Sequence, residues 1–279
     1  MKYFLLILSA VALNACQRTP TSTNTPAATP YATPTETPMA AAPAKAGIAI
    51  PPQASWQIQY SGDMDYAIDV DVFNLDLFDT DAAMISQLHE RDIFVMCYFS
   101  AGSHEEWRPD ISRFSADTLG NDMEGWPGEK WLDIRQLERI APTMEARLDL
   151  AVQKDCDGVD PDNVNGYTND TGFPLSYEDQ IAYNIFLAEA AHLRGLSIGL
   201  KNELEQIDDL LPYYDWALNE ECFSYNECDL LLPFIEAGKP VFVIEYETST
   251  EEFCPSANAM GFNAIQKNWD LDAFVTPCR

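Results

Sequence analysis

Two short apolar segments of this chain end in carboxylates of the type that can cleave a glycosidic bond. One segment is Gly158–Asp162, and the other is Trp216–Asn219, which is followed directly by Glu220. A glycosidase needs two carboxyl groups that flank one bond, one of them ionised and the other carrying a proton. The pattern therefore predicts a hydrolytic site, provided that both segments are strands ending at the same face of one fold.

The residues beside the two carboxylates suggest a role for each. Asp162 is the candidate nucleophile, because it follows a strand end stiffened by Pro161 and has Asn163 beside it as a donor. Glu220 is the candidate general acid and base, because apolar residues precede it and low polarity raises the pKa of a carboxyl group. Glu221 competes with Glu220 for that role, and the residues alone do not choose between them.

Polar groups follow most of the other predicted strands, so the same face is expected to hold the substrate. Lys201 either orients Asp162, contacts a sugar or neutralises buried acids. For Asp160 and Asp162 the structural alternative is to cap the next helix or to pair with Lys201. The residues expected to bind substrate are Asp76, Tyr98, Asp160, Asn163, Lys201, Asn202, Asn219, Glu245 and Tyr246.

Aromatic side chains form a second class of candidate sugar contacts, because their faces can stack on sugar rings. Roughly half of any such set is ordinary core or surface. The candidates are Trp56, Tyr60, Tyr98, Trp107, Trp126 and Tyr246.

The chain alternates strand-like and helix-like segments, which favours a parallel sheet with crossover helices. Eight strands would close a (β/α)8 TIM barrel, an α/β fold. The candidates are Trp56–Tyr60, Val70–Phe78, Ile93–Ser100, Trp131–Ile134, Gly158–Asp162, Leu196–Asn202, Trp216–Asn219, Val241–Tyr246 and Phe262–Gln266. These are nine, so one of them is not a barrel strand. Without the last, Asp162 and Glu220 follow the fifth and seventh strands.

Four amphipathic stretches between the strands are long enough for crossover helices. They are Asp81–Arg91, Leu137–Gln153, Tyr177–Arg194 and Glu203–Leu211. Ser176 and Asp179 have the spacing of a capping box at the start of the third, and Gly195 is a favourable end for it.

The net charge is −29, from 16 basic and 45 acidic residues. So acidic a protein is a poor partner for nucleic acid or an anionic lipid surface. A cationic substrate fits the charge, and so does a merely solvated acidic surface.

The first fifty residues do not have the pattern of a folded domain. Residues 1–16 resemble a lipoprotein-type signal peptide: Lys2 precedes an apolar run, and Leu13–Cys16 resembles a bacterial lipobox in which Cys16 is lipidated. The alternative is an ordinary secretory signal with a coincidental Cys. Residues 17–50 are rich in Thr, Pro and Ala and predict a disordered tether. We therefore expect an exported protein, either secreted or held in the bacterial envelope by a lipid anchor, whose folded domain spans 51–279.

Seven cysteines are present, and export permits disulfides. We expect Cys222 to pair with Cys228 and Cys254 with Cys278, whereas Cys97 and Cys156 lie in apolar contexts typical of buried thiols. The chain has no CxxC pair and only three His, which argues against a zinc site, so no metal or cofactor is predicted. We expect a monomer.

Several segments together resemble glycoside hydrolase family 114, the endo-α-1,4-polygalactosaminidase-like proteins. They occur in the family's order over most of 55–247. The segments are Trp56–Gln59, Asn74–Phe78, Cys97–Ser103, Trp131–Ile134, Asp157–Asn163, Gly195–Asn202, Asn219–Cys222 and Glu245–Tyr246.

The resemblance implies a (β/α)8 barrel that hydrolyses internal α-1,4-galactosaminidic bonds in a cationic, partly deacetylated polysaccharide. It implies a catalytic pair at Asp162 and Glu220, which decides between Glu220 and Glu221. The chain departs from the family at Asp160, where most members have Glu before the Pro, and this puts a sugar contact from that position in doubt.

Three alternatives remain open. The first is a glycosidase that acts on another amino-sugar or neutral polymer. The second is a non-catalytic acidic lipoprotein that binds cationic polysaccharide. The third is a metal-dependent hydrolase that uses the same acids.

Overall fold

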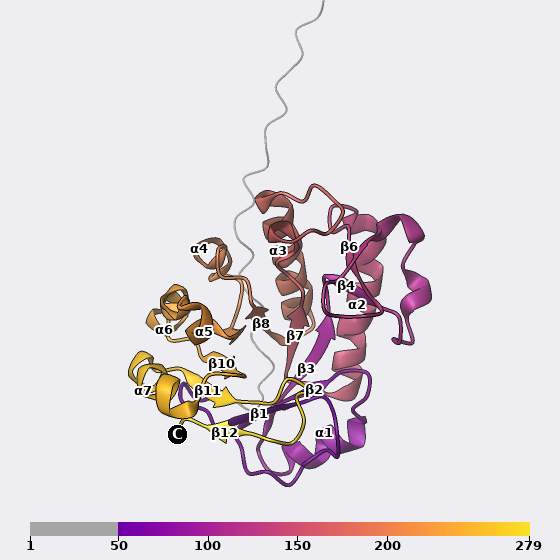
Figure 1. The fold of residues 1–279 in the computed structure, drawn as a ribbon. Helices are drawn as coiled ribbons and strands as arrows, with labels where there is room; N and C mark the ends of the chain where they lie inside the picture. Colours follow the sequence, from indigo (N-terminus) through magenta and orange to yellow (C-terminus); the bar gives the residue numbers. More distant parts are fainter. Residues whose placement is uncertain (1–49) are drawn as a thin grey trace, which may run out of the picture. The chain divides into compact units, whose positions relative to one another are not determined.

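The computed structural model describes residues 50–279, which form a (β/α)8 barrel (Figure 1). The eight barrel strands are parallel and lie in chain order, and a ninth strand, β12, pairs antiparallel with the last of them. The barrel strands are β1 (Trp56–Gln59), β2 (Val72–Asp76), β3 (Phe94–Ser100), β7 (Gly158–Asp162), β8 (Ser197–Lys201), β9 (Trp216–Glu220), β10 (Val241–Glu245) and β11 (Asn263–Gln266), and the added strand β12 spans Thr276–Pro277.

Side chains and the segment after β11 connect the first barrel strand to the last. The indole N–H of Trp56 donates to the Asn263 carbonyl at 2.8 Å, and Lys267 Nζ donates to Gln57 Oε1 at 2.8 Å. The backbone N–H of Tyr60 donates to the Leu271 carbonyl at 2.9 Å. These contacts hold β1 beside β11.

The outer layer consists of helices that follow the strands. They are α1 (Ala82–His89), α2 (Leu137–Lys154), α3 (Tyr177–Leu193), α4 (Ile207–Leu210), α5 (Cys222–Tyr225), α6 (Leu232–Glu236) and α7 (Thr250–Met260), with single 3-10 turns η1 (Ile111–Arg113), η2 (Ala116–Thr118), η3 (Gly166–Thr168) and η4 (Cys228–Leu231). The predicted capping box of Ser176 and Asp179 is present at the start of α3. The helix expected over Glu203–Leu211 is confined to Ile207–Leu210, and Gln206 just before it donates its side chain to the Tyr177 carbonyl at 2.8 Å.

The strand expected at Trp131–Ile134 is not part of the barrel. It lies in β6 (Glu129–Leu132), the middle strand of a small antiparallel sheet with β4 (Ser103–Glu105) and β5 (Leu119–Asp122). Its place in the barrel is taken by β11, the ninth candidate. Asp162 and Glu220 therefore end the fourth and sixth barrel strands, not the fifth and seventh. A short apolar run has the same pattern in either kind of sheet, so the sequence did not separate them.

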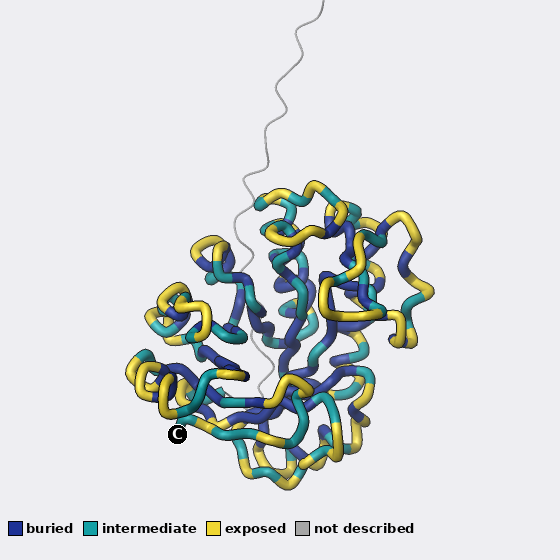
Figure 2. Tube along the Cα trace, viewed as in Figure 1, coloured by how far each residue is buried: buried dark blue, intermediate teal, exposed yellow. Residues whose placement is uncertain are grey.

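The buried side chains form an inner and an outer layer, and the strands that separate them are dark in Figure 2. The inner cluster fills the barrel and includes Trp216, Phe242 and Met96. At Gly199 a Cβ atom would lie 2.0 Å from the Trp216 ring, so only glycine leaves room for that indole. The outer cluster lies between strands and helices and holds most of the apolar core.

Three disulfides cross-link the domain. The predicted pairs Cys222–Cys228 and Cys254–Cys278 are confirmed. The expectation that Cys97 and Cys156 are buried thiols is wrong: they form a third disulfide, with Cα atoms 6.1 Å apart. They come together because β3, which holds Cys97, pairs in parallel with β7, which begins just after Cys156.

The predicted signal peptide, the lipidated Cys16 and most of the tether lie outside the described residues. Within 50–279, no helix has the length and apolar character needed to cross a membrane.

Candidate active site

Asp162 and Glu220 lie on either side of one lysine. Their strands, β7 and β9, both pair with β8, which ends at Lys201. Lys201 Nζ is 3.5 Å from Asp162 Oδ2 and 3.5 Å from Glu220 Oε2, so these two oxygens are no more than twice that distance apart. Carboxylate pairs are about 5–5.5 Å apart in retaining glycosidases and about 6.5–9.5 Å apart in inverting ones, so this upper limit admits the retaining distance and excludes most of the inverting range.

The lysine is buried, whereas the two carboxylates remain partly open to solvent. The Lys201 side chain is 2% exposed, compared with 20% for Asp162 and 24% for Glu220. Burial alone would lower the pKa of Lys201, but the charges of Asp162, Glu220 and Asp160 raise it above its ordinary value. Lys201 is therefore a permanent cation that reaches the pair from inside the barrel.

Backbone groups hold Asp162 in place. Its Oδ1 accepts from the backbone N–H of Asn163 at 2.8 Å, and its carbonyl accepts from Ala101 at 2.8 Å and Gly102 at 3.0 Å. A Cβ atom at Gly102 would lie 1.6 Å from the Asn163 carbonyl oxygen, so glycine is needed for this approach. Of the two structural alternatives for Asp162, the structure shows the ion pair with Lys201.

Glu220 accepts two hydrogen bonds besides its contact with Lys201. The Tyr246 hydroxyl donates to Oε1, and Asn202 Nδ2 donates to Oε2 at 2.8 Å. Burial raises the pKa of Glu220, but Lys201 and these donors outweigh it, and the pKa is lowered. The expectation of a raised pKa is wrong. Trp216 and Leu218 lie inside the barrel on the same side of β9 as Glu220, but the Glu220 carboxylate itself meets Lys201, Asn202 and Tyr246.

Asn202 positions Glu220 through both ends of its amide. While Nδ2 donates to the Glu220 carboxylate, Oδ1 accepts from the Glu220 backbone N–H at 2.9 Å and from Asn219 Nδ2 at 3.3 Å. Asn202 has a φ of 53°, a left-handed conformation that Asn tolerates better than most residues. The predicted residues Asn202 and Asn219 are therefore brought to Glu220.

Asp160 lies beneath the pair inside the barrel. Its Oδ2 accepts from Asn74 Nδ2 at 2.8 Å, and Asn74 Oδ1 accepts from the Tyr60 hydroxyl at 2.9 Å. Within residues 50–279, Oδ1 of this fully buried carboxyl has no hydrogen-bond partner. Burial is the main cause that raises the pKa of Asp160 to about 6, against the lowering effect of Lys201.

Tyr98 and Tyr60 line the same region. Their ring centroids are 4.6 Å apart, and Lys201 Nζ lies 5.8 Å from the Tyr98 centroid. Tyr98 is thus near the pair, as predicted. Tyr60 is placed there as well, and Trp56 is instead part of the barrel core.

A relay of buried polar groups behind Asp162 was not predicted. Asn163 Nδ2 donates to Ser100 Oγ at 2.8 Å, Ser100 Oγ and Ser103 Oγ are 2.6 Å apart, and Ser103 Oγ donates to Glu129 Oε2 at 2.8 Å. Burial, with added repulsion from Glu105 and Asp162, raises the pKa of Glu129 to about 7 although the Ser103 bond lowers it. A signal was present in the polar residues within apolar strands, but the small sheet that holds Glu129 was not expected.

Two predicted substrate contacts are occupied by protein groups. The Asp76 carboxylate binds Arg108, with Oδ2 2.7 Å from Nη2, and Oδ1 accepts from the Phe78 N–H at 2.8 Å. The Glu245 carboxylate accepts from the backbone N–H of Phe223 at 2.8 Å and from Ser224 Oγ at 2.7 Å. Both carboxylates are therefore already paired with protein groups.

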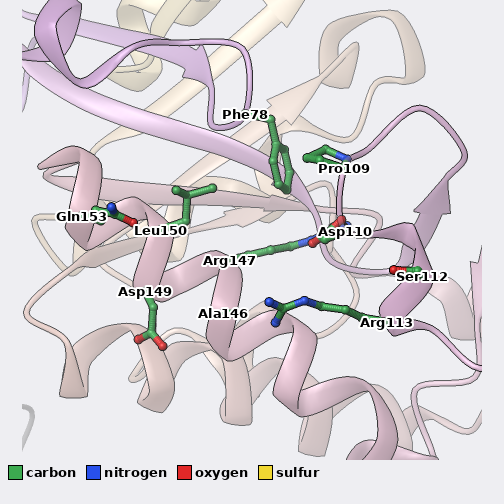
Figure 3. Close-up of a pocket in the computed structure, with 10 residues that line it drawn as sticks. All are labelled: Phe78, Pro109, Asp110, Ser112, Arg113, Ala146, Arg147, Asp149, Leu150 and Gln153. Carbon is green, nitrogen blue, oxygen red and sulfur yellow. Dashed lines mark hydrogen bonds and ion pairs between the residues drawn. The ribbon is translucent and has the colours of Figure 1, made fainter.

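The cavity in Figure 3, of about 400 Å³, lies on the outside of the barrel between α2 and residues 109–113. Arg147 extends from α2 toward Asp110 and donates from Nε to Oδ2 at 2.8 Å. A second cavity, of about 460 Å³, is lined by the small sheet and Trp126. Neither includes Asp162 or Glu220. Among residues 50–279, no cluster of three or more His, Cys, Asp or Glu is arranged to hold a metal ion.

Comparisons with known proteins identify the family of this chain. The model of glycoside hydrolase family GH114 matches residues 36–279. The crystal structure of Aspergillus fumigatus Ega3 in complex with galactosamine is similar to this chain, with 40% identity and a TM-score of 0.79 over 84% of this chain and 99% of that one. The glycoside hydrolase domain of PelA from Pseudomonas aeruginosa, with 13% identity, shares the fold, with a TM-score of 0.64 over 80% and 97% of the two chains. No curated protein matches. Because the family model matches residues 36–279, which is most of the sequence, this chain belongs to glycoside hydrolase family 114.

Proposed function

We propose that this glycoside hydrolase cleaves internal α-1,4-galactosaminidic bonds in a cationic, partly deacetylated polysaccharide, and that Asp162 and Glu220 are its catalytic pair. The observation that carries the proposal is the placement of both carboxylates 3.5 Å from Lys201 at the open ends of β7 and β9. The galactosamine in the structure of the 40% identical Ega3 supports the sugar class. The net charge of −29 suits a cationic polymer.

The proposed reaction has two steps. Asp162, which pairs with Lys201, attacks the anomeric carbon while Glu220 gives its proton to the leaving glycosidic oxygen, and the bond between that oxygen and the carbon breaks. Water then attacks the same carbon, gives its proton to Glu220 and releases Asp162. Asn202 and Tyr246 act as positioning residues for Glu220.

The lowered pKa of Glu220 predicts an acidic optimum. If Glu220 supplies the proton, kcat/KM depends on its protonated fraction in the free enzyme, which falls about tenfold per pH unit above its pKa. Since Lys201 and the hydrogen-bond donors lower the pKa of Glu220 from its ordinary value, kcat/KM is expected to fall steadily from pH 5 to pH 8. A profile that stays flat to pH 7 would show that another group carries the proton.

The substrate and the pair are tested together with purified, partly deacetylated α-1,4-galactosaminogalactan. Wild type is expected to release short oligomers, and Asp162→Asn and Glu220→Gln to lose at least about a thousandfold in kcat. Exposed Glu189→Gln on α3 is the matched control. Binding without cleavage by wild type would favour the non-catalytic alternative, and cleavage of other polymers alone would reject the galactosamine substrate.

The two roles separate on a substrate that needs no protonation. With an activated aryl α-galactosaminide, Glu220→Gln is expected to release the aryl group in a first burst and then slow down, because only the second step needs its base. Asp162→Asn is expected to show no burst. The reverse result would exchange the two roles.

We also propose that the chain is exported through residues 1–16 and lipidated at Cys16, so that 17–50 tether the barrel to a bacterial envelope. The lipobox-like Leu13–Cys16 supports this proposal. Mass spectrometry of the mature protein is expected to show cleavage before Cys16 and an added diacylglycerol, both lost in Cys16→Ser. A mature chain without lipid would favour secretion.

A further inference from the structure

An exposed indole lies beside the catalytic glutamate. The Trp269 ring stacks on the Tyr246 ring, with centroids 4.0 Å apart and an angle of 14° between the planes. Tyr246 is buried, whereas Trp269 remains 52% exposed. Since Tyr246 covers one face of the indole, the accessible area of Trp269 is on its other face and its edges. Flat, open aromatic faces of this kind are suited to stacking on the C–H groups of a sugar.

Hydrogen bonds fix this indole relative to Glu220. Trp269 Nε1 donates to Glu247 Oε1 at 2.8 Å, and the Tyr246 hydroxyl donates to Glu220 Oε1. The segment that carries Tyr246 and Glu247 is tied to β11 by Gln266 Nε2, which donates to the Thr248 carbonyl at 3.1 Å. The catalytic carboxylate, the tyrosine and the indole therefore form one continuous and ordered arrangement.

The same region is strongly acidic. Glu221 feels repulsion from Glu245, Glu220 and Glu247, which adds to burial in raising its pKa. Both oxygens of the Glu245 carboxylate already accept hydrogen bonds from α5. Glu221 and Glu247 are the carboxylates that can still attract a cation here, because Glu247 uses only Oε1 for the indole.

We propose that Trp269 and Glu247 form a subsite for a deacetylated, cationic hexosamine residue on the leaving-group side of the scissile bond. The sugar ring would stack on the free face of Trp269, and its ammonium would meet Glu247, with Glu221 adding charge. We assign the subsite to the leaving-group side because its aromatic residues are joined to Glu220, the residue proposed to protonate the leaving oxygen. This inference rests on the proposed function and names the residues that select deacetylated units next to the cleaved bond.

The test compares chain cleavage of fully deacetylated and fully N-acetylated α-1,4-linked galactosamine hexamers. Trp269→Ala removes the stacking face and is expected to reduce kcat/KM about 10- to 100-fold on any hexamer that wild type cleaves. That reduction corresponds to a loss of about 1.4–2.7 kcal/mol of transition-state stabilisation. Trp269→Phe is expected to recover most of the loss. Glu247→Gln keeps an acceptor for the indole N–H and removes the charge, so it is expected to reduce only cleavage of the deacetylated hexamer.

Two controls lie elsewhere on the surface. Leu193→Ala removes another exposed apolar side chain, and Glu189→Gln removes another exposed acid, both on α3. Neither is expected to change the ratio between the two hexamers. If wild type cleaves but Trp269→Ala and Glu247→Gln match the controls, the subsite is rejected and the proposed function stands. If Glu247→Gln affects both hexamers equally, recognition of the ammonium is rejected. If wild type cleaves neither, the proposed function fails first.

Discussion

At the scale of single residues, Lys201 gives the site its electrostatic character. It is almost fully buried, yet the carboxylates of Asp162, Glu220 and Asp160 surround it and keep it charged. A buried charge without partners is costly, so the lysine and the acids stabilise one another. Two of the three interpretations of Lys201 are compatible with this arrangement, because Lys201 pairs with Asp162 and also lies among buried acids.

Replacing Lys201 with Met is expected to reduce kcat/KM by at least about 100-fold, because a preorganised charge next to the proposed catalytic carboxylates is lost. It is also expected to move the pH profile upward. Lys201 is the largest of the causes that lower the pKa of Glu220, so without it Glu220 keeps its proton to higher pH. The measurement is kcat/KM from pH 4 to 9 in both proteins.

A purely structural role for Lys201 would lower activity without moving the profile. Circular dichroism of Lys201→Met checks that the barrel is folded. An unchanged pH dependence in a folded variant would contradict the assignment.

At the scale of elements, the small antiparallel sheet is an insertion between β3 and α2 that completes the site. It supplies Ser103 and Glu129 to the relay behind Asp162. The Cys97–Cys156 disulfide joins the strand before this insertion to the segment after it, across 59 residues. Cys222–Cys228 closes a loop of only six positions around α5.

The two disulfides are expected to differ in how much they stabilise the fold. In the chain-entropy model a longer closed loop restricts the unfolded chain more, so losing Cys97–Cys156 should cost about 2 kcal/mol more than losing Cys222–Cys228. The measurement is guanidinium unfolding of the paired Cys→Ala variants at Cys97 and Cys156 and at Cys222 and Cys228. Equal or reversed losses would show that contacts around the bridges matter more than loop length.

At the scale of the whole molecule, buried acids make stability depend on pH. Glu203 is 2% exposed, and burial followed by the charge of Glu205 raises its pKa to about 8. In the unfolded chain the same carboxyl releases its proton near its ordinary pKa of about 4.3. Between these values the folded protein binds more protons than the unfolded chain, so its stability falls as pH rises.

Glu203→Gln is therefore expected to raise the free energy of unfolding at pH 8 by on the order of 1–3 kcal/mol and to change it little at pH 4. The side-chain size is kept and the buried ionisation is removed. Thermal unfolding at the two pH values, with Glu189→Gln as an exposed control, measures the effect. An equal shift at both pH values would mean that ionisation is not the cause.

The acidic charge of the whole chain predicts a salt effect on substrate binding. A net charge of −29 attracts a polycation, and salt screens that attraction. Raising NaCl from 50 to 500 mM is expected to increase KM for the deacetylated polymer several-fold. For an uncharged, N-acetylated oligomer KM is expected to stay nearly constant, and a parallel rise for both would argue against steering by charge.

The sequence by itself determined the alternation of strands and helices, the capping box at Ser176 and the carboxylates that end two strands. These are local properties, because hydrophobic periodicity and cap chemistry depend on near neighbours in the chain. The positions of Asp162 and Glu220 at strand ends followed from the same pattern.

Only the tertiary structure decided which strands close the barrel and what surrounds each carboxylate. The apolar run at Trp131–Ile134 pairs in a separate sheet, Cys97 meets Cys156 across paired segments, and Glu220 meets Lys201, Asn202 and Tyr246 instead of apolar groups. Strand pairing and pKa both depend on groups that are distant in sequence and close in space, so a local pattern does not contain them.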